Sequence, residues 1–133
     1  MIMKSSKEIC LILGLVICNL VSFSQTTVSQ SDFINKELLV AKLVINEEDK
    51  SDNLAKITIT KDQWVEYDHQ DNIIGVAKIL KVSDNMIKIE WKQADNGANV
   101  GDVTIYNVSI KDKKLHFNIH FDGSNKGYFE VNL

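Results

Sequence analysis

From residue 37 onward the chain repeats one pattern. Short runs rich in Ile, Val, Thr and aromatic residues are each closed by Asp, Asn, Gly, Ser or Lys. Such runs predict β-strands, and no segment of useful length carries the period of an amphipathic helix. The expected strands are 37–46, 54–60, 63–68, 73–82, 86–92, 101–111, 114–121 and 127–133. The sequence therefore predicts an all-β fold.

The connections between these runs determine how the strands pair. Turn-like pairs such as Lys61-Asp62 and Asp112-Lys113 join successive runs, and the longer connections are 46–53, which is acidic, and 93–100. A parallel pair needs a crossover of about a dozen residues or more, so we expect an eight-stranded antiparallel up-and-down meander. Its first and last strands are antiparallel to each other. Pairing them removes both sheet edges, so we expect a closed barrel rather than an open sandwich.

Side-chain alternation predicts which face of a strand is buried. In 114–121 the residues from Leu115 to Phe121 alternate between apolar side chains and polar ones, among them His116 and His120. This alternation is typical of a sheet with one face on the core and one in water. We expect both histidines on the solvated face.

Three other runs depart from this alternation. The runs 37–46 and 73–82 are apolar on both faces, which predicts a cover over the second face of each. In 101–111 the apolar phase changes part of the way along the run. A β-bulge near Ile105 or Tyr106 would produce such a change.

The N-terminus carries a different pattern. Lys4 and Lys7 precede an apolar run of 13 residues, 9–21, and small residues at positions 22 and 24 lie at −3 and −1 of a cleavage point before Gln25. This is the layout of a secretory signal peptide. As a helix the run would span about 20 Å, short of the roughly 30 Å hydrocarbon core, so a stable transmembrane span is not expected.

The sequence thus divides into a signal peptide (1–24), a polar tether (25–36) in which Ser31 or Asp32 would cap one helical turn, and a β-barrel domain (37–133). We expect the protein to be exported, to the periplasm or beyond. The bulky Ile17 before Cys18 disfavours lipid anchoring at that cysteine, because the lipid-attachment motif normally has a small residue there.

Composition excludes several chemistries. Both cysteines, Cys10 and Cys18, fall in the predicted signal, so the exported domain has no disulfide, thiolate nucleophile or Cys-ligated zinc. Loss of 1–24 leaves 13 basic and 17 acidic residues, a net charge of −4, and the chain has no arginine. Arginine dominates recognition of phosphate and guanine edges, so nucleic acid is not an expected partner.

The strand pattern resembles the lipocalin-like (calycin-type) small barrels of bacterial exported proteins. The residues that carry the resemblance are Lys56 to Trp91, with the hairpin "ITITKDQWVEYD" and the segment "IIGVAKILKVSDNMIKIEW", and the closing "KLHFNIHFDGSNKGYFEVNL". The chain departs from lipocalins proper at its first strand, where Glu37-Leu38-Leu39-Val40 replaces their Gly-x-Trp. The resemblance implies an apolar ligand inside the barrel. An eight-stranded barrel either holds one small ligand or is filled by its own side chains.

Metal binding and catalysis find little support in the sequence. His116 and His120 lie about 13 Å apart on a strand, too far to share one ion, and the acidic loop 46–53 lacks the spacing of a calcium loop. We expect no metal, no cofactor and no enzymatic activity. Glu66 has the same parity as Trp64. It would have a raised pKa if buried, but we expect it to face outward.

The candidate ligand-binding residues are aromatic: Trp64, Tyr67, Trp91 and Tyr106. Trp91 falls on an interior parity, whereas Trp64 is expected at the barrel mouth or in a partner-binding patch. We expect a monomeric, non-enzymatic binding protein that carries a small apolar ligand. The alternative is a protein-interaction module, an inhibitor or accessory subunit, that uses the outer face and the loops. A void lined by Trp91 and Tyr106 would favour the carrier, and a solid core would favour the module.

Overall fold

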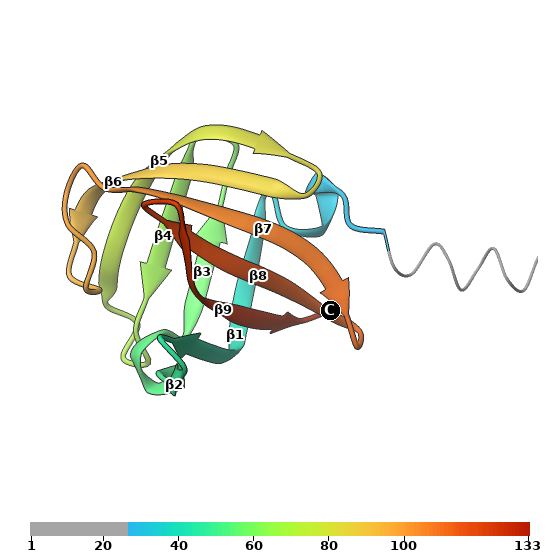
Figure 1. The fold of residues 1–133 in the computed structure, drawn as a ribbon, viewed down its shortest axis with the longest axis horizontal. Coiled ribbons are helices and arrows are strands. Elements are labelled where there is room, and N and C mark those ends of the chain that lie inside the picture. The colour runs from blue at the N-terminus through green and yellow to red at the C-terminus, as the bar shows by residue number, and fades with distance from the viewer. Residues whose placement is uncertain (1–26) are drawn as a thin grey trace, which may run out of the picture.

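A computed structural model describes residues 27–133, and in it the alternating runs form nine strands (Figure 1). They are β1 (Lys36–Ile45), β2 (Glu48–Asp49), β3 (Lys56–Ile59), β4 (Gln63–Tyr67), β5 (Ile73–Ser83), β6 (Met86–Ala94), β7 (Val103–Lys111), β8 (Lys114–Phe121) and β9 (Ser124–Asn132). All their pairings are antiparallel, in the order β2-β1-β3-β4-β5-β6-β7-β8-β9 with β1 also paired to β9. The predicted all-β, eight-stranded, closed meander is confirmed, with β2 as an extra strand.

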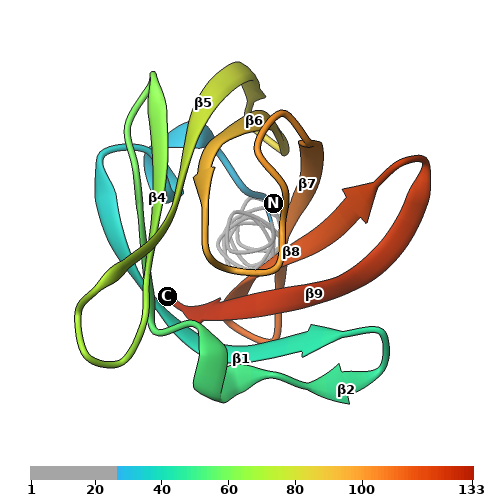
Figure 2. The same ribbon diagram turned by 90° about the vertical axis from the view of Figure 1, so that its left-hand side faces the viewer.

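The barrel closes because β1 changes partner along its length. Its first residues, Lys36–Leu39, pair with β3, and the stretch from Val40 to Ile45 pairs with β9. A register shift between Val40 and Lys42 marks the change. Figure 2 looks along the barrel and shows β1 and β9 side by side at this seam.

The acidic connection 46–53 is more ordered than we predicted. Asn46 and Glu47 both have positive φ, 50° and 68°, as the tight turn of a two-residue hairpin requires. This turn returns the chain so that β2 pairs with the end of β1, and a short 3-10 turn, Ser51–Asn53, follows. The prediction of a plain loop is therefore wrong for Glu48–Asp49.

A 3-10 turn, Gln30–Asp32, precedes the barrel. The Asp32 carboxylate accepts a hydrogen bond from the backbone N–H of Ser29 at 2.9 Å, which stabilises the start of the turn. The predicted helical turn exists but begins earlier in the chain than expected. It places Phe33, fully buried, inside the barrel. The predicted signal peptide and Cys18 lie outside the described residues.

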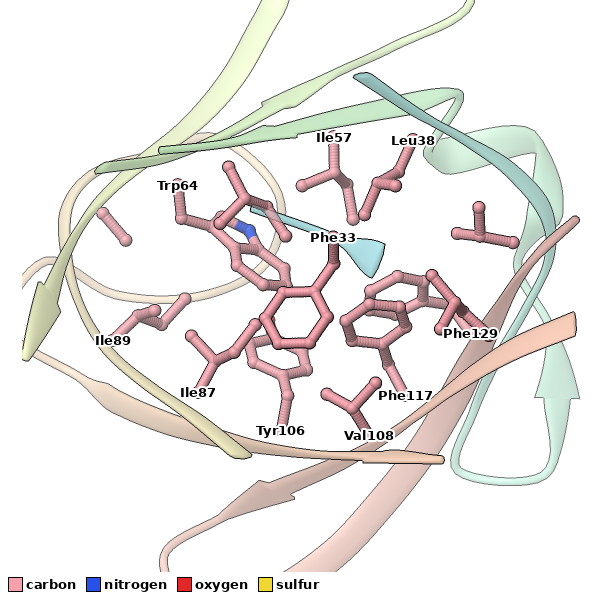
Figure 3. Close-up of a cluster of buried hydrophobic side chains, with 14 of the residues drawn as sticks. Phe33, Leu38, Ile57, Trp64, Ile87, Ile89, Tyr106, Val108, Phe117 and Phe129 are labelled. Atoms are coloured by element: carbon pink, nitrogen blue, oxygen red, sulfur yellow. The ribbon is translucent and has the colours of Figure 1, made fainter. Parts of the chain in front are cut away.

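Aromatic side chains fill much of the barrel interior (Figure 3). Phe117 and Phe129 stack with ring centroids 4.4 Å apart, and Trp64 stacks on Tyr106 at 4.3 Å. Phe33 meets Phe117 edge to face at 6.1 Å. Such pairs each add about 0.5–1.5 kcal/mol beyond the burial of their area, so this cluster is the main packing unit of the core.

The irregular strands differ from the predicted ones. β7 pairs with β6 and β8 without a register shift, so the predicted bulge near Ile105 or Tyr106 is wrong. Tyr106 faces inward, and Ile105 is half-buried on the outer face. Register shifts occur elsewhere, and two of them fall in the strands that are apolar on both faces: between Val40 and Lys42 in β1, and between Ile79 and Lys81 in β5. After each shift the other set of alternating residues points into the barrel. This change explains much of why the sequence of β1 and β5 is apolar on both faces.

Two outward apolar residues, Leu39 of β1 and Leu80 of β5, have no cover among residues 27–133. Leu39 is 64% exposed and Leu80 is 43% exposed. The predicted cover over the second face is therefore absent from the described part of the chain. Single exposed apolar side chains are common on protein surfaces, so an apolar outward position does not by itself imply a covering element.

Candidate ligand cavity

Side chains leave part of the barrel interior open at one end. A cavity of about 440 Å³ lies there, and part of the hydrophobic core, including Trp91, Tyr106 and Phe129, forms its wall. The largest apolar parts of its wall are Leu43, Leu54, Trp91, Ile119, Phe121 and Phe129. Its volume falls within the range of about 300–1,000 Å³ typical of small-molecule sites.

The connection between β6 and β7 curls over the cavity end of the barrel (Figure 2). It is held by backbone hydrogen bonds to the barrel, from Asp95 N–H to the Ile74 carbonyl and from Gly101 N–H to the Trp91 carbonyl, both 2.8 Å. Asn96, Ala98 and other residues of this connection line the cavity. The loop therefore forms part of the wall.

Gly75 in β5 allows this loop to approach closely. A Cβ built on Gly75 would lie 2.7 Å from a ring carbon of Trp91 and 2.8 Å from Nδ2 of Asn96. Only a residue without a side chain leaves room for both neighbours at this position. The glycine thus lets Trp91 and Asn96 meet at the cavity wall.

Glu66 is the main polar group of the cavity, and it is only 6% exposed. Its two carboxylate oxygens accept separate hydrogen bonds, from Trp64 Nε1 at 2.9 Å and from Asn96 Nδ2 at 2.7 Å. Burial raises the pKa of Glu66 above its ordinary value, and these two hydrogen bonds oppose the rise. The prediction that Glu66 faces outward is wrong, because β4 is an interior strand whose inward positions are Trp64 and Glu66.

Two more polar side chains lie in the same wall. Thr104 accepts a hydrogen bond from Trp91 Nε1 at 3.1 Å, which fixes the indole. Tyr106 is 3% exposed, and no hydrogen bond of its hydroxyl group is found within residues 27–133. Burial, together with the charge of Glu66, raises the pKa of Tyr106 well above its ordinary value, so the phenol stays protonated.

The structure separates the four predicted ligand-binding residues. Trp91 and Tyr106 line the cavity. Trp64 is fully buried behind the wall and reaches it only through its bond to Glu66, so its predicted place at the mouth or in a surface patch is wrong. Tyr67 lies outside the cavity, half-buried, with the Lys56 ammonium 4.4 Å from its ring centroid.

Four polar residues that the sequence did not single out as ligand-binding also line the cavity: Asn96, Thr104, Lys50 and Lys126. Asn96 was visible only as part of an Asp-Asn-Gly turn. Thr104 has the inward parity of Tyr106, which was an available signal. The lysines come from connections whose path depends on β2 and on the β8–β9 hairpin, and no local pattern places them there.

The histidines are arranged differently from expectation. His116 is only 8% exposed: it stacks on Tyr128 at 4.7 Å, and its Nδ1 lies 3.3 Å from a Glu130 oxygen. The prediction of a solvated His116 is therefore wrong, because outward side chains of β8 and β9 cover one another.

Within the described part of the chain no three His, Cys, Asp or Glu side chains gather as a metal site would need. Between residues 27 and 133, no helix has the length and apolar character to cross a bilayer.

Comparisons with protein-family models, with curated proteins and with solved structures find no match to this chain. The geometry of the cavity is therefore the basis for a proposed function.

Proposed function

We propose that this protein is an exported, non-enzymatic carrier of a small and largely apolar molecule, bound in the cavity between Trp91 and Tyr106. The observation that carries the proposal is the cavity of about 440 Å³ that side chains leave open at one end of an otherwise packed barrel. A barrel needed only as a rigid scaffold gains stability from filling its interior, since an unfilled cavity forfeits packing contacts.

The composition of the wall supports binding rather than catalysis. Small-molecule sites combine apolar and aromatic walls with a few polar groups that orient the ligand. Here the walls are aliphatic and aromatic, and the buried polar groups are Glu66, Thr104 and Tyr106. The lipocalin-like resemblance points to the same activity. We infer export from the N-terminal sequence, and we propose that the carrier acts as a monomer.

The competing proposal is a protein-interaction module. It draws support from apolar side chains on the outer surface, among them Leu39, Ile73 and Leu80, which are 64%, 47% and 43% exposed. Exposed apolar residues that gather into a patch mark interaction surfaces. The cavity favours the carrier, because a module of this kind has no use for an open interior.

A pair of adjacent substitutions tests the carrier. Ile74 lines the cavity, and its neighbour Ile73 is exposed. Ile74→Trp places an indole in the cavity, whereas Ile73→Trp adds the same group at an exposed position. With the neutral apolar dye N-phenyl-1-naphthylamine, we expect Ile74→Trp to weaken binding about tenfold or more and Ile73→Trp to leave it within about twofold.

Native mass spectrometry of freshly purified protein provides the second readout. A bound small molecule that the dye displaces supports the carrier. If the wild-type protein carries no small molecule and binds no dye, the interaction module is the better proposal. The same holds if the dye binds both variants equally well.

A further inference from the structure

The carboxylate of Glu66 has unused hydrogen-bonding capacity inside the cavity. A carboxylate has about four acceptor positions, and only two are filled within residues 27–133, by Trp64 and Asn96. Both donors are electrically neutral. The side chain lines the cavity while only 6% exposed, so its free acceptor positions face a site from which a bound ligand excludes water.

Glu66 also lacks a countercharge. Within the described part of the chain no Lys or His nitrogen lies within 4.0 Å of its oxygens. The other charged side chains at the cavity are Lys50, Asp102 and Lys126, all half-exposed, and Lys50 is paired with Glu48 at 3.1 Å. A buried carboxylate without a cation is costly, and a cation delivered by the ligand would remove that cost.

The surroundings of Glu66 also suit a cation with an apolar body. Trp91 is an aromatic residue of the cavity wall, and aromatic faces attract cations. The Tyr106 hydroxyl, free of partners between residues 27 and 133, is a second polar contact in the same wall. Leu43, Leu54 and Ile119 supply apolar surface for the remainder of the ligand.

We propose that the ligand is an apolar molecule with a protonated amine, and that its ammonium group donates hydrogen bonds to Glu66 inside the cavity. This inference rests on the proposed carrier function and specifies the class of ligand. Glu66 acts as the binding group for the ligand head, and the hydrogen bonds from Trp64 and Asn96 hold the carboxylate in position.

Three probes of equal chain length test the proposal by isothermal titration calorimetry: octylamine, octanol and octanoate. For the wild-type protein we expect octylamine to bind at least about tenfold more tightly than octanol, and octanoate to bind most weakly. Glu66→Gln should weaken octylamine binding by about tenfold or more and change octanol binding by less than about threefold. Asp102→Asn, at the other cavity carboxylate, is the matched control and should keep the preference for the amine.

A pH series on the wild-type protein provides a test that needs no variant. An alkylammonium ion, like lysine, keeps its proton up to a pH of about 10. Octylamine affinity should therefore rise as pH increases through the raised pKa of Glu66, while octanol affinity stays constant. The other titratable groups at the cavity are Lys50, Asp102, Tyr106 and Lys126, and no histidine is among its lining residues.

The outcomes separate this inference from the carrier proposal. Octanol binding without a preference for the amine would overturn the amine inference and leave the carrier in place. Tightest binding of octanoate would also overturn it, and would assign the ligand head to Lys50 or Lys126. Failure of all three probes and of the neutral dye would contradict the carrier itself.

Discussion

Closure of the barrel requires a glycine at position 127 of β9, because a side chain as small as a methyl group would meet the backbone of β1. Gly127 pairs with Ile45 of β1 across the seam and has φ of +143°, a backbone conformation that L-residues rarely adopt. A Cβ built there would overlap the Val44 carbonyl oxygen and would lie 2.9 Å from the carbonyl carbon. Gly127→Ala therefore forces β1 and β9 apart by a distance on the order of 1 Å.

The cost of Gly127→Ala has two parts. The positive φ costs about 1–3 kcal/mol for a residue with a side chain. Separation of the strands weakens the hydrogen bonds beside the seam, such as that from Asn46 N–H to the Lys126 carbonyl at 2.8 Å, at about 1 kcal/mol each. We expect a total loss of about 3–5 kcal/mol in the free energy of unfolding.

Gly123→Ala is the matched control. Gly123 also has positive φ, +79°, but a Cβ there meets nothing within 4 Å. Only the conformational cost remains, about 1–2 kcal/mol. Urea unfolding followed by circular dichroism measures both losses. Equal losses for the two variants would show that β1 and β9 do not approach as closely as the closed barrel requires.

Further predictions concern the core, the outer face, the buried carboxylate and export. Phe117→Ala should lower the free energy of unfolding by about 3–5 kcal/mol, against about 1–2 kcal/mol for the half-buried Phe121→Ala, and similar losses in urea titrations would contradict the aromatic packing around Phe117. His116→Asp should cost more than about 0.5 kcal/mol, because it puts a carboxylate opposite Glu130, and a neutral effect would mean that the two side chains do not meet. Folding raises the pKa of Glu66, so the folded state binds the carboxyl proton more tightly than the unfolded state does. The protonated carboxyl group therefore contributes its full stabilisation below the unfolded pKa. This stabilisation is lost as pH rises through the folded pKa. Relative to Glu66→Gln, the wild-type protein should therefore lose stability in thermal melts as pH rises above the ordinary pKa of about 4.5. The same pH dependence in both proteins would place Glu66 in water. Mass spectrometry of protein exported by a bacterial host should give a chain that begins at Gln25, and a full-length mass or a lipid on Cys18 would contradict the signal-peptide interpretation.

The strands were predictable because their pattern is local. Alternation in 114–121 placed Leu115 and Phe117 in the core, and short turn-like connections required antiparallel neighbours. Closure followed from topology, since a meander with an even number of strands brings the first and last strands together in antiparallel orientation. No long-range information was needed for these conclusions.

The site was only partly predictable because its shape depends on distant segments. Trp91 and Tyr106 were identified from aromatic type and parity, and both line the cavity. Parity alone could not decide which face of 63–68 was inward, and the burial of Glu66 depends on the indole N–H of Trp64 and on the amide of Asn96 in another loop. The core also includes Phe33, which comes from the segment that the sequence predicts to be a polar tether.

The central claim, that a ligand binds inside the barrel, has one direct test. The protein has two tryptophans, and both indole N–H groups donate to cavity residues, Trp91 to Thr104 and Trp64 to Glu66. Two-dimensional ¹H–¹⁵N NMR resolves these two indole signals during a titration with octylamine. We expect both signals to shift with a single saturating dependence on ligand concentration. If both stay fixed while backbone amides of the outer face shift, the ligand binds outside the barrel and the carrier proposal is wrong.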